Sequence, residues 1–233
     1  MLTFHSSRRR CQDGLSLIEL MVGMAIGAFI IVGVMYLFTA DIQGNRKLIA
    51  TTRVEQDLRN ITDLITRDVR RAGYWGNSVL GTVAIGATAA TTSNPYAAMT
   101  AASSATSGSV SYSFSRDAVE NNTLDANEQF GYQLNTTTGV LKMQTASGTV
   151  QSLNDPNFVK ITAFSVTDSS PPVLSLGYRC PTVCLAGTPN CPQMFIRRYD
   201  LVLTATSALD STVVRTMNTT IRARNDQTTG ACS

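Results

Sequence analysis

The sequence predicts an α+β protein, in which one long N-terminal α-helix with a membrane-spanning first half packs on an antiparallel β-sheet head. Three observations support this prediction. Residues 15–38 are apolar apart from Ser16 and Glu19. Residues 54–72 repeat apolar side chains at helical spacing, and short β-type runs follow Val110, separated by Gly, Asn, Asp and Ser clusters. Because no helical pattern alternates with these runs, a parallel α/β sheet is not expected.

The composition excludes several classes of protein. The chain has 233 residues, a formal net charge of +3 and 15% charged residues, whereas about 25% is usual. We therefore expect no nucleic-acid partner. Hydrophobic residues make up 43% of the chain, with 7 Pro and 16 Gly, which is not the composition of a disordered or collagen-like protein.

No familiar catalytic motif occurs in the sequence. It contains no Gly-x-Ser-x-Gly elbow, no Walker loop, no Gly-x-Gly-x-x-Gly turn and no His-Glu-x-x-His pair. The single histidine, His5, lies near the N-terminus. The sequence therefore predicts neither an enzyme nor a bound cofactor.

Residues 15–38 are long enough to cross a membrane once. These 24 residues form a helix roughly 36 Å long at about 1.5 Å per residue, and a bilayer core is about 30 Å thick. Arg8, Arg9 and Arg10 precede the stretch, and the positive-inside tendency places that end in the cytoplasm. We expect residues 15–38 to contact membrane lipid and the bulk of the chain to lie outside the cytoplasm.

Glu19 is an ionisable residue close to the start of this apolar stretch. A charge at the centre of a membrane costs nominally about 2.5–3.5 kcal/mol and less near the edge, and such residues usually have a partner. The alternative is that Glu19 lies at the headgroup level, where it stays hydrated.

The seven residues Gly-Leu-Ser-Leu-Ile-Glu-Leu at 14–20, after a short basic leader, resemble the class III signal of type IV pilins and pseudopilins. The resemblance implies that an inner-membrane prepilin peptidase cuts between Gly14 and Leu15 and methylates Leu15. It also implies that Glu19 pairs with the N-terminal ammonium of a neighbouring subunit, which offsets the cost of burying either charge. The family most often has Phe at the position of Leu15. His5 and Cys11 would leave with the leader.

The helix is expected to continue from the apolar stretch to about residue 72. The apolar face consists of Val54, Leu58, Ile61, Ile65, Val69 and Ala72, and the opposite face carries charges of both signs. Glu55–Arg59 and Asp63–Arg67 are spaced as i, i+4 ion pairs, and Gly73 is a natural stop. The predicted organisation is therefore a leader at 1–14, a transmembrane half-helix at 15–38, an amphipathic half-helix at 39–73 and a periplasmic head at 74–233.

The helix exit carries a second resemblance. The segment Arg-Arg-Ala-Gly-Tyr-Trp-Gly at 70–76 is similar to the corresponding segment of PilW-type minor pilins and of J-type minor pseudopilins. Together the two resemblances imply the type IV pilin fold.

The head is expected to contain a long loop followed by an antiparallel meander. Residues 77–109 are rich in Ala, Thr, Ser and Gly and predict the loop. Along the run 157–166, Val159, Ile161, Ala163 and Ser165 are expected to face one way. The predicted strands are residues 110–114, 129–134, 139–144, 149–153, 157–166, 173–178, 194–206 and 212–224.

Four cysteines lie in the predicted head: Cys180, Cys184, Cys191 and Cys232. Their spacing fits no standard zinc knuckle and no His is near, so disulfides in an oxidising periplasm are the better interpretation. Four cysteines allow three pairings. We favour one bridge within residues 180–191 and one that ties back Cys232.

Acidic and amide residues gather at 117–128. Oxygen-rich loops can hold calcium, but this one lacks the order of an EF-hand. A solvated turn is the preferred interpretation, and no metal site is assigned.

These observations favour a minor pilin of PilW type, inserted in the bacterial inner membrane with a periplasmic head and later part of the pilus. Its expected partners are the prepilin peptidase, other minor pilins, the major pilin and the inner-membrane assembly platform. The first alternative is a J-type minor pseudopilin of a type II secretion system. A lower-ranked alternative is a signal-anchored periplasmic enzyme or adhesin.

Overall fold

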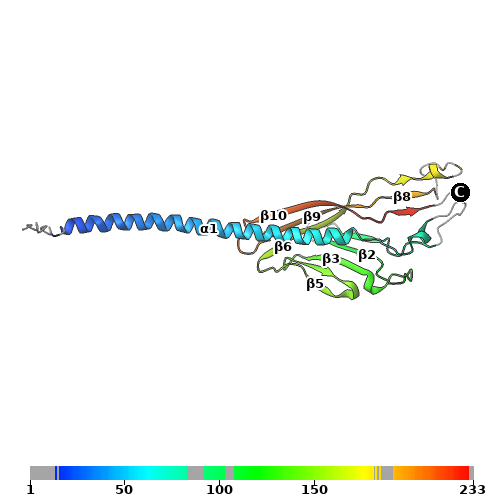
Figure 1. Cartoon of the computed structure of the whole chain (residues 1–233), viewed down its shortest axis with the longest axis horizontal. Helices are drawn as coiled ribbons and strands as arrows, with labels where there is room; N and C mark the ends of the chain where they lie inside the picture. Colours follow the sequence, from blue (N-terminus) through cyan, green and yellow to red (C-terminus); the bar gives the residue numbers. More distant parts are fainter. Residues whose placement is uncertain are drawn as a thin grey trace, which may run out of the picture. The chain divides into compact units, whose positions relative to one another are not determined.

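The computed structural model describes residues 14, 16–82, 92–102, 108–180, 182, 184 and 191–230 (Figure 1). By internal packing the chain divides into two units, residues 1–48 and residues 49–233, which we call the head. The helix α1, Leu17–Val69, contributes to both units. The remaining helices are single 3₁₀ turns: η1 (Ser78–Gly81), η2 (Ala126–Glu128), η3 (Ala146–Gly148) and η4 (Gly177–Arg179).

The described strands of the head form three antiparallel sheets. The first sheet has the order β1-β2-β3-β4-β5, with β1 Met99–Ala102, β2 Ser109–Ser113, β3 Gln129–Asn135, β4 Val140–Gln144 and β5 Val150–Ser152. The second has the order β10-β9-β6, with β10 Val214–Arg222, β9 Arg198–Ser207 and β6 Val159–Asp168. The third joins three short strands in the order β11-β8-β7, with β11 Gln227–Thr229, β8 Gln193–Phe195 and β7 Leu174–Ser175.

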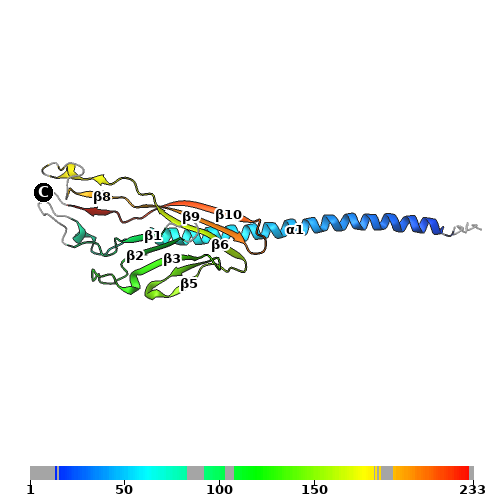
Figure 2. The same ribbon diagram turned by 180° about the vertical axis from the view of Figure 1, so that it is seen from behind.

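The part of α1 that belongs to the head covers one face of the strands, since it runs in front of them in Figure 1 and behind them in Figure 2. All six apolar residues that the helical spacing predicts to face the core are buried, and Ala50 is buried with them; the six are Val54, Leu58, Ile61, Ile65, Val69 and, just after α1, Ala72. They pack with apolar residues of both sheets in one core cluster. The predicted α+β, type IV pilin fold is confirmed.

A buried hydrogen bond joins α1 to the first sheet. The phenol of Tyr132 on β3 donates to Asp68 Oδ2 at 2.7 Å, and both residues are buried. The Asp68 carboxylate therefore has a charge-assisted partner inside the core. Burial is the main cause that raises the pKa of Tyr132 well above its usual value, and the nearby Tyr112 and Asp68 add to the effect. The phenol therefore stays protonated and donates its hydrogen bond at neutral pH.

On the exposed face of α1 one of the two predicted ion pairs is present. Arg59 pairs with Glu55, as the spacing predicts. Arg67 instead has its Nε 3.6 Å from Asp68 Oδ1.

Three predictions about strands are wrong in detail. Residues 99–102, expected within a loop, form β1 because they pair with β2 over four positions while Met99 and Ala101 pack against the core. The run 194–206 is divided between β8 and β9, which belong to different sheets. The run 173–178 gives only the two-residue strand β7, followed by η4.

Strand β6 contains an irregularity that changes which side chains face the core. Its pairing with β9 shifts between Ile161 and Ala163. Val159 and Ile161 are buried as predicted, but beyond the shift the buried residues are Phe164 and Val166. The prediction that Ala163 and Ser165 share the face of Val159 is therefore wrong, because a bulge inserts one residue and reverses the alternation.

The helix exit is the segment 70–74, and its backbone carbonyls are hydrogen-bonded by distant parts of the head. The helix α1 ends at Val69, three residues before the expected end, and residues 70–73 form a turn that finishes at Gly73, whose φ is +75°. Gly73 N–H donates to Ser113 O at 2.8 Å, and Ser115 N–H donates to Tyr74 O at 2.9 Å. Other donors to these carbonyls include Arg224 N to Arg70 O (3.0 Å), Asn94 Nδ2 to Gly73 O (3.0 Å) and Asn225 Nδ2 to Ala72 O (3.2 Å).

Arg197 lies in the link between β8 and β9, and its side chain packs against the helix exit. Its Nη1 donates to Ala97 O at 2.9 Å, and its Nη2 donates to Asn225 O at 2.6 Å and to Ala72 O at 3.3 Å. The residue is only 8% exposed. A side chain at Gly73 would overlap this guanidinium. The cation thus fills the space left by Gly73 and lies at the negative end of the α1 dipole.

Replacing Arg197 with Met should destabilise the head by about 3 kcal/mol, because one buried and two part-buried carbonyls lose a charged donor. Urea unfolding of the full chain in lipid nanodiscs measures this, with fluorescence of Trp75, the single tryptophan, as the signal. Arg198→Met is the matched control, because Arg198 is the next residue in the chain and its side chain is exposed. Equal unfolding midpoints for the two variants would contradict the role of Arg197.

Candidate processing and assembly site

The first turn of α1 carries the predicted processing and assembly residues. Gly14 is exposed, and Leu15 lies outside the described residues. The carbonyl of Ser16 accepts the first helical hydrogen bonds, from Glu19 N at 3.0 Å and Leu20 N at 3.1 Å. Glu19 is exposed in the first turn of the helix, where a carboxylate is favoured by the positive end of the helix dipole.

The apolar part of α1 presents its side chains to the outside. Among the described residues, α1 is the one helix long and apolar enough to cross a membrane. None of the apolar window that meets this test is buried. The exposed large apolar residues include Leu17, Ile18, Met21, Phe29, Ile30, Val32, Met35, Tyr36 and Phe38. Such an area cannot remain in water, so this part of the helix requires an apolar environment of lipid or of other helices.

The cysteine-rich loop contains a disulfide between Cys184 and Cys191. Cys180 is also disulfide-bonded. Cys232 lies outside the described residues. A bridge within residues 180–191 closes a short loop next to the third sheet and restricts the unfolded chain.

The acidic segment 117–128 is used for internal hydrogen bonding. Glu120 Oε2 accepts from Gly76 N at 3.0 Å, and Glu128 accepts from Arg116 N and Asp125 N, both at 2.9 Å. Among the described residues, no group of three or more His, Cys, Asp or Glu side chains is placed to hold a metal ion. Several of the oxygen atoms that suggested calcium thus accept hydrogen bonds from backbone N–H groups.

Tyr96 connects this segment to the residues after the helix exit. Its phenol oxygen lies 3.0 Å from Glu120 Oε1 and 3.1 Å from Glu128 Oε1. Burial and then the two carboxylates raise the pKa of Tyr96, so the phenol stays protonated. Burial acts to raise the pKa of Glu120 as well, but hydrogen bonds from Ser115 and from backbone N–H groups outweigh it and lower that pKa.

Sequence reasoning did not find the residues that organise the helix exit. Tyr96 and Asn94 lie in the stretch interpreted as a loop, and Arg197 lies inside a run interpreted as one strand. One sequence feature could have indicated a buried cation, namely the Arg-Arg pair at 197–198 within an alternating run. Because adjacent side chains of a strand point to opposite faces, one of the two arginines must face inward. Such a pair does not reveal which carbonyls the inward cation meets.

Comparison with known protein families gives two matches. Residues 9–35 match the prokaryotic N-terminal methylation motif, which covers Gly14, Leu15 and Glu19. Residues 47–223, more than half of the chain, match prepilin peptidase-dependent protein B. No curated protein and no solved structure matches the chain at a significant level.

The apolar N-terminal helix, the methylation motif and the β-sheet head together define a type IV pilin-like protein of the prepilin class. Families of this class are structural subunits. Within the class, this chain belongs to the family of prepilin peptidase-dependent protein B.

Proposed function

We propose that this chain is a minor pilin of PilW type, a structural subunit of a bacterial type IV pilus that joins other minor pilins in the tip complex that primes assembly of the major pilin. The observation that supports this most strongly is the methylation motif at the start of a helix whose apolar, membrane-length window has no buried residue. Residues 70–76, which directly follow α1, support the assignment to the PilW type by their similarity to the same segment of PilW-type minor pilins.

In this proposal the chain is a precursor with four parts. Residues 1–14 are a leader that the prepilin peptidase removes after Gly14, and Leu15 becomes the methylated first residue. Residues 15–38 lie in the inner membrane, residues 39–73 are the amphipathic half of the helix, and residues 74–233 form a periplasmic head. The mature subunit then leaves the membrane through the assembly platform and enters the pilus.

Four cysteines would remain in the mature chain, and their pairing fits an oxidising compartment. Cys184 and Cys191 are bonded to each other, and Cys180 is bonded as well. We assign Cys232 as the partner of Cys180, which would tie the C-terminal end to the loop. A periplasmic head is consistent with this use of cysteine.

Glu19 is assigned the role of the assembly carboxylate. Its side chain is exposed among apolar neighbours on the first turn of α1, where a bilayer gives it no partner. The ammonium of a neighbouring subunit's first residue would supply the opposite charge in a medium of low dielectric constant, where the attraction is strong. This pairing also explains why an ionisable residue stands in a segment that otherwise avoids charge.

Glu19→Ala should reduce incorporation of the subunit into filaments at least tenfold and leave the head folded, because Glu19 lies outside the head unit. Immunoblots of sheared filaments against whole cells measure incorporation. Glu55→Ala is the matched control, since Glu55 is another exposed glutamate of α1 whose ion pair with Arg59 is solvent-exposed. Normal incorporation of the Glu19 variant would refute the assigned role.

A J-type minor pseudopilin of a type II secretion system is the second candidate, because residues 70–76 resemble that group too. Deletion of the gene distinguishes the two. The pilus assignment predicts loss of surface pili and of twitching motility, both restored by the wild-type chain, with protein secretion unchanged. Intact pili together with failed secretion would contradict the pilus assignment and support the pseudopilin.

A further inference from the structure

Strand β10 is an outer strand of the second sheet, and its free edge is long and regular (Figure 1). It pairs with β9 over nine successive positions, from Val214 opposite Thr206 to Arg222 opposite Arg198, without a register shift. The strand contains no proline and no lysine, and residues 216–221 carry no charge. Natural proteins usually protect a sheet edge with such residues, with a bulge or with a short strand. The edge strand β5 of the first sheet, for example, has only three residues.

The hydrogen bonds at the two ends of β10 show which backbone groups face this edge. Ser207 N donates to Val213 O at 3.0 Å before the strand, and Ala223 N donates to Arg197 O at 3.1 Å after it. Opposed residues of an antiparallel pair alternate between bonded and non-bonded pairs, so the odd-numbered residues of β10 bond to β9. The N–H and C=O groups of the even-numbered residues therefore point to the free edge: Val214, Thr216, Asn218, Thr220 and Arg222.

Most of these edge groups are unpaired in the described part of the chain. One exception is Val214 O, which accepts from Arg215 Nη1 at 2.9 Å. From Thr216 to Arg222, no described group outside β9 makes a hydrogen bond to the backbone. The next outward N–H, that of Arg224, donates to Arg70 O at 3.0 Å. The edge is thus closed at the helix exit and open along residues 216–222.

The inner side of β10 is fixed to the core of the head. Ile221 is fully buried, and Met217 is partly buried and packs against the core cluster. The hydroxyl of Thr62 on α1 donates to Met217 Sδ at 3.8 Å. A strand held in this way has little freedom to lose when another strand pairs with it, which favours binding.

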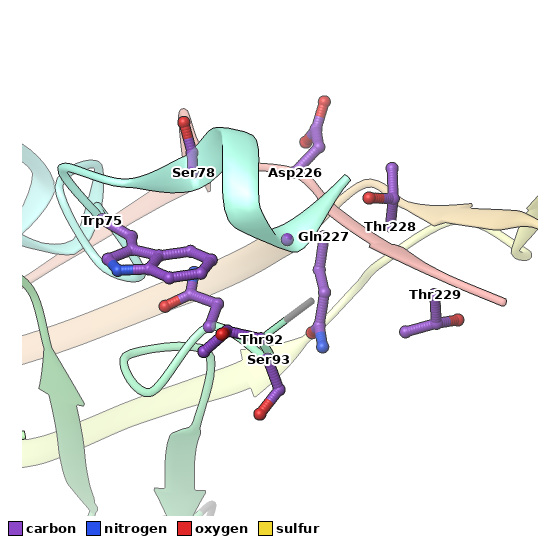
Figure 3. Close-up of a pocket in the computed structure, with 10 residues that line it drawn as sticks. Trp75, Ser78, Thr92, Ser93, Asp226, Gln227, Thr228 and Thr229 are labelled. Atoms are coloured by element: carbon purple, nitrogen blue, oxygen red, sulfur yellow. The ribbon is translucent and has the colours of Figure 1, made fainter. Parts of the chain in front are cut away.

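The charges of β10 indicate which strand would pair with it. Arg215 and Arg222 lie near its two ends and are exposed, and the strand contains no carboxylate. Arg222 Nη2 donates to Asp226 Oδ2 at 2.9 Å, and Asp226 borders the pocket of about 250 Å³ that Figure 3 shows. Arg224 adds an exposed cation just beyond the strand. Because opposite charges on paired strands are favourable, the complementary strand is uncharged at its centre and acidic at its ends.

A second copy of this chain is a poor occupant of the edge. A parallel pair of β10 strands in register would place each arginine opposite the same arginine of the other copy. An antiparallel pair along the whole strand would place Arg215 beside Arg222 of the other copy. Like charges in these positions are destabilising, so the occupant is a different protein.

We propose that the free edge of β10 is a docking site for an extended strand of another protein subunit, with acidic residues at the ends of that strand. Main-chain hydrogen bonds to residues 216–222 supply the affinity, and the arginines select the partner. On the inner side, the added strand covers the accessible parts of Met217 and Thr219. The site lies within the head, and this assignment does not depend on which filament the subunit joins.

Amide hydrogen exchange tests the proposal with two capped nine-residue peptides. Both have the centre Thr-Val-Thr-Val-Thr, and one carries two glutamates at each end where the other carries two lysines. Each sequence reads the same in both directions, so either strand direction can form. The full chain in lipid nanodiscs is mixed with each peptide at up to about 1 mM, since single strands bind weakly. The glutamate peptide should slow exchange at the amides of Thr216, Asn218 and Thr220 at least threefold, and the lysine peptide should not.

Two substitutions at one position isolate the backbone contribution. Asn218→Pro removes an outward N–H from the middle of the edge without removing a bond to β9, and it should abolish the protection of Thr216 and Thr220. Asn218→Ala is the matched control, because it keeps the N–H. Replacing both Arg215 and Arg222 with Glu should transfer the protection from the glutamate peptide to the lysine peptide, a gain that a misfolded variant would not show.

Four results would overturn the proposal. The glutamate peptide protects none of the three amides, or both peptides protect them equally. The variants Asn218→Pro and Asn218→Ala respond alike, or the charge-reversed variant still prefers the glutamate peptide. Protection that rises with the concentration of the chain itself, without peptide, would identify a second copy as the occupant and would also overturn it.

Discussion

The hydrogen bonds at the helix exit are the constraint on which the head depends. The carbonyls of residues 70–74 accept hydrogen bonds from Ser115, just after β2, from Asn94, from Arg197 and from residues 224–225. The last carbonyls of a helix have no hydrogen-bond partner within the helix. Burying such a carbonyl without a donor lowers the stability of the folded protein. Some of these donors are 100 residues or more from their acceptors in the sequence, for example Arg197 from both Ala72 and Ala97. The first sheet, the second sheet and α1 are therefore fixed at one point.

The same helix meets two different physical requirements along its length. In the head its apolar face is buried against two sheets, whereas in the first unit its large apolar side chains are exposed. The exposed half requires an apolar environment, which either lipid or other helices can supply. Glu19 interrupts this apolar half with one ionisable side chain. It lies in the first turn of α1, within the methylation motif, so the two ends of the apolar half differ in charge.

Much of the fold was predictable from local sequence signals, and the parts that were not depend on distant contacts. Helical spacing identified all six core residues from Val54 to Ala72, and Gly73 marked the helix end because only a residue tolerant of positive φ fits there. Strands β2 to β5 follow from turn signals between neighbours. The bulge in β6 and the split between β8 and β9 could not be foreseen, since they are set by pairing partners far along the chain. The N-terminal motif could be identified from the sequence because it is a short continuous segment. The roles of Tyr96, Asn94 and Arg197 could not, because their hydrogen-bond partners lie far away in the sequence.

The central claim is that this chain is a prepilin whose mature form begins at Leu15. Intact-mass spectrometry of the protein isolated from membranes of its own host tests this claim most directly. The account predicts a chain that lacks residues 1–14 and carries one additional methyl group, which tandem fragmentation places on the α-amino group of Leu15. A full-length chain, a cut at any other position or an unmethylated Leu15 would contradict it.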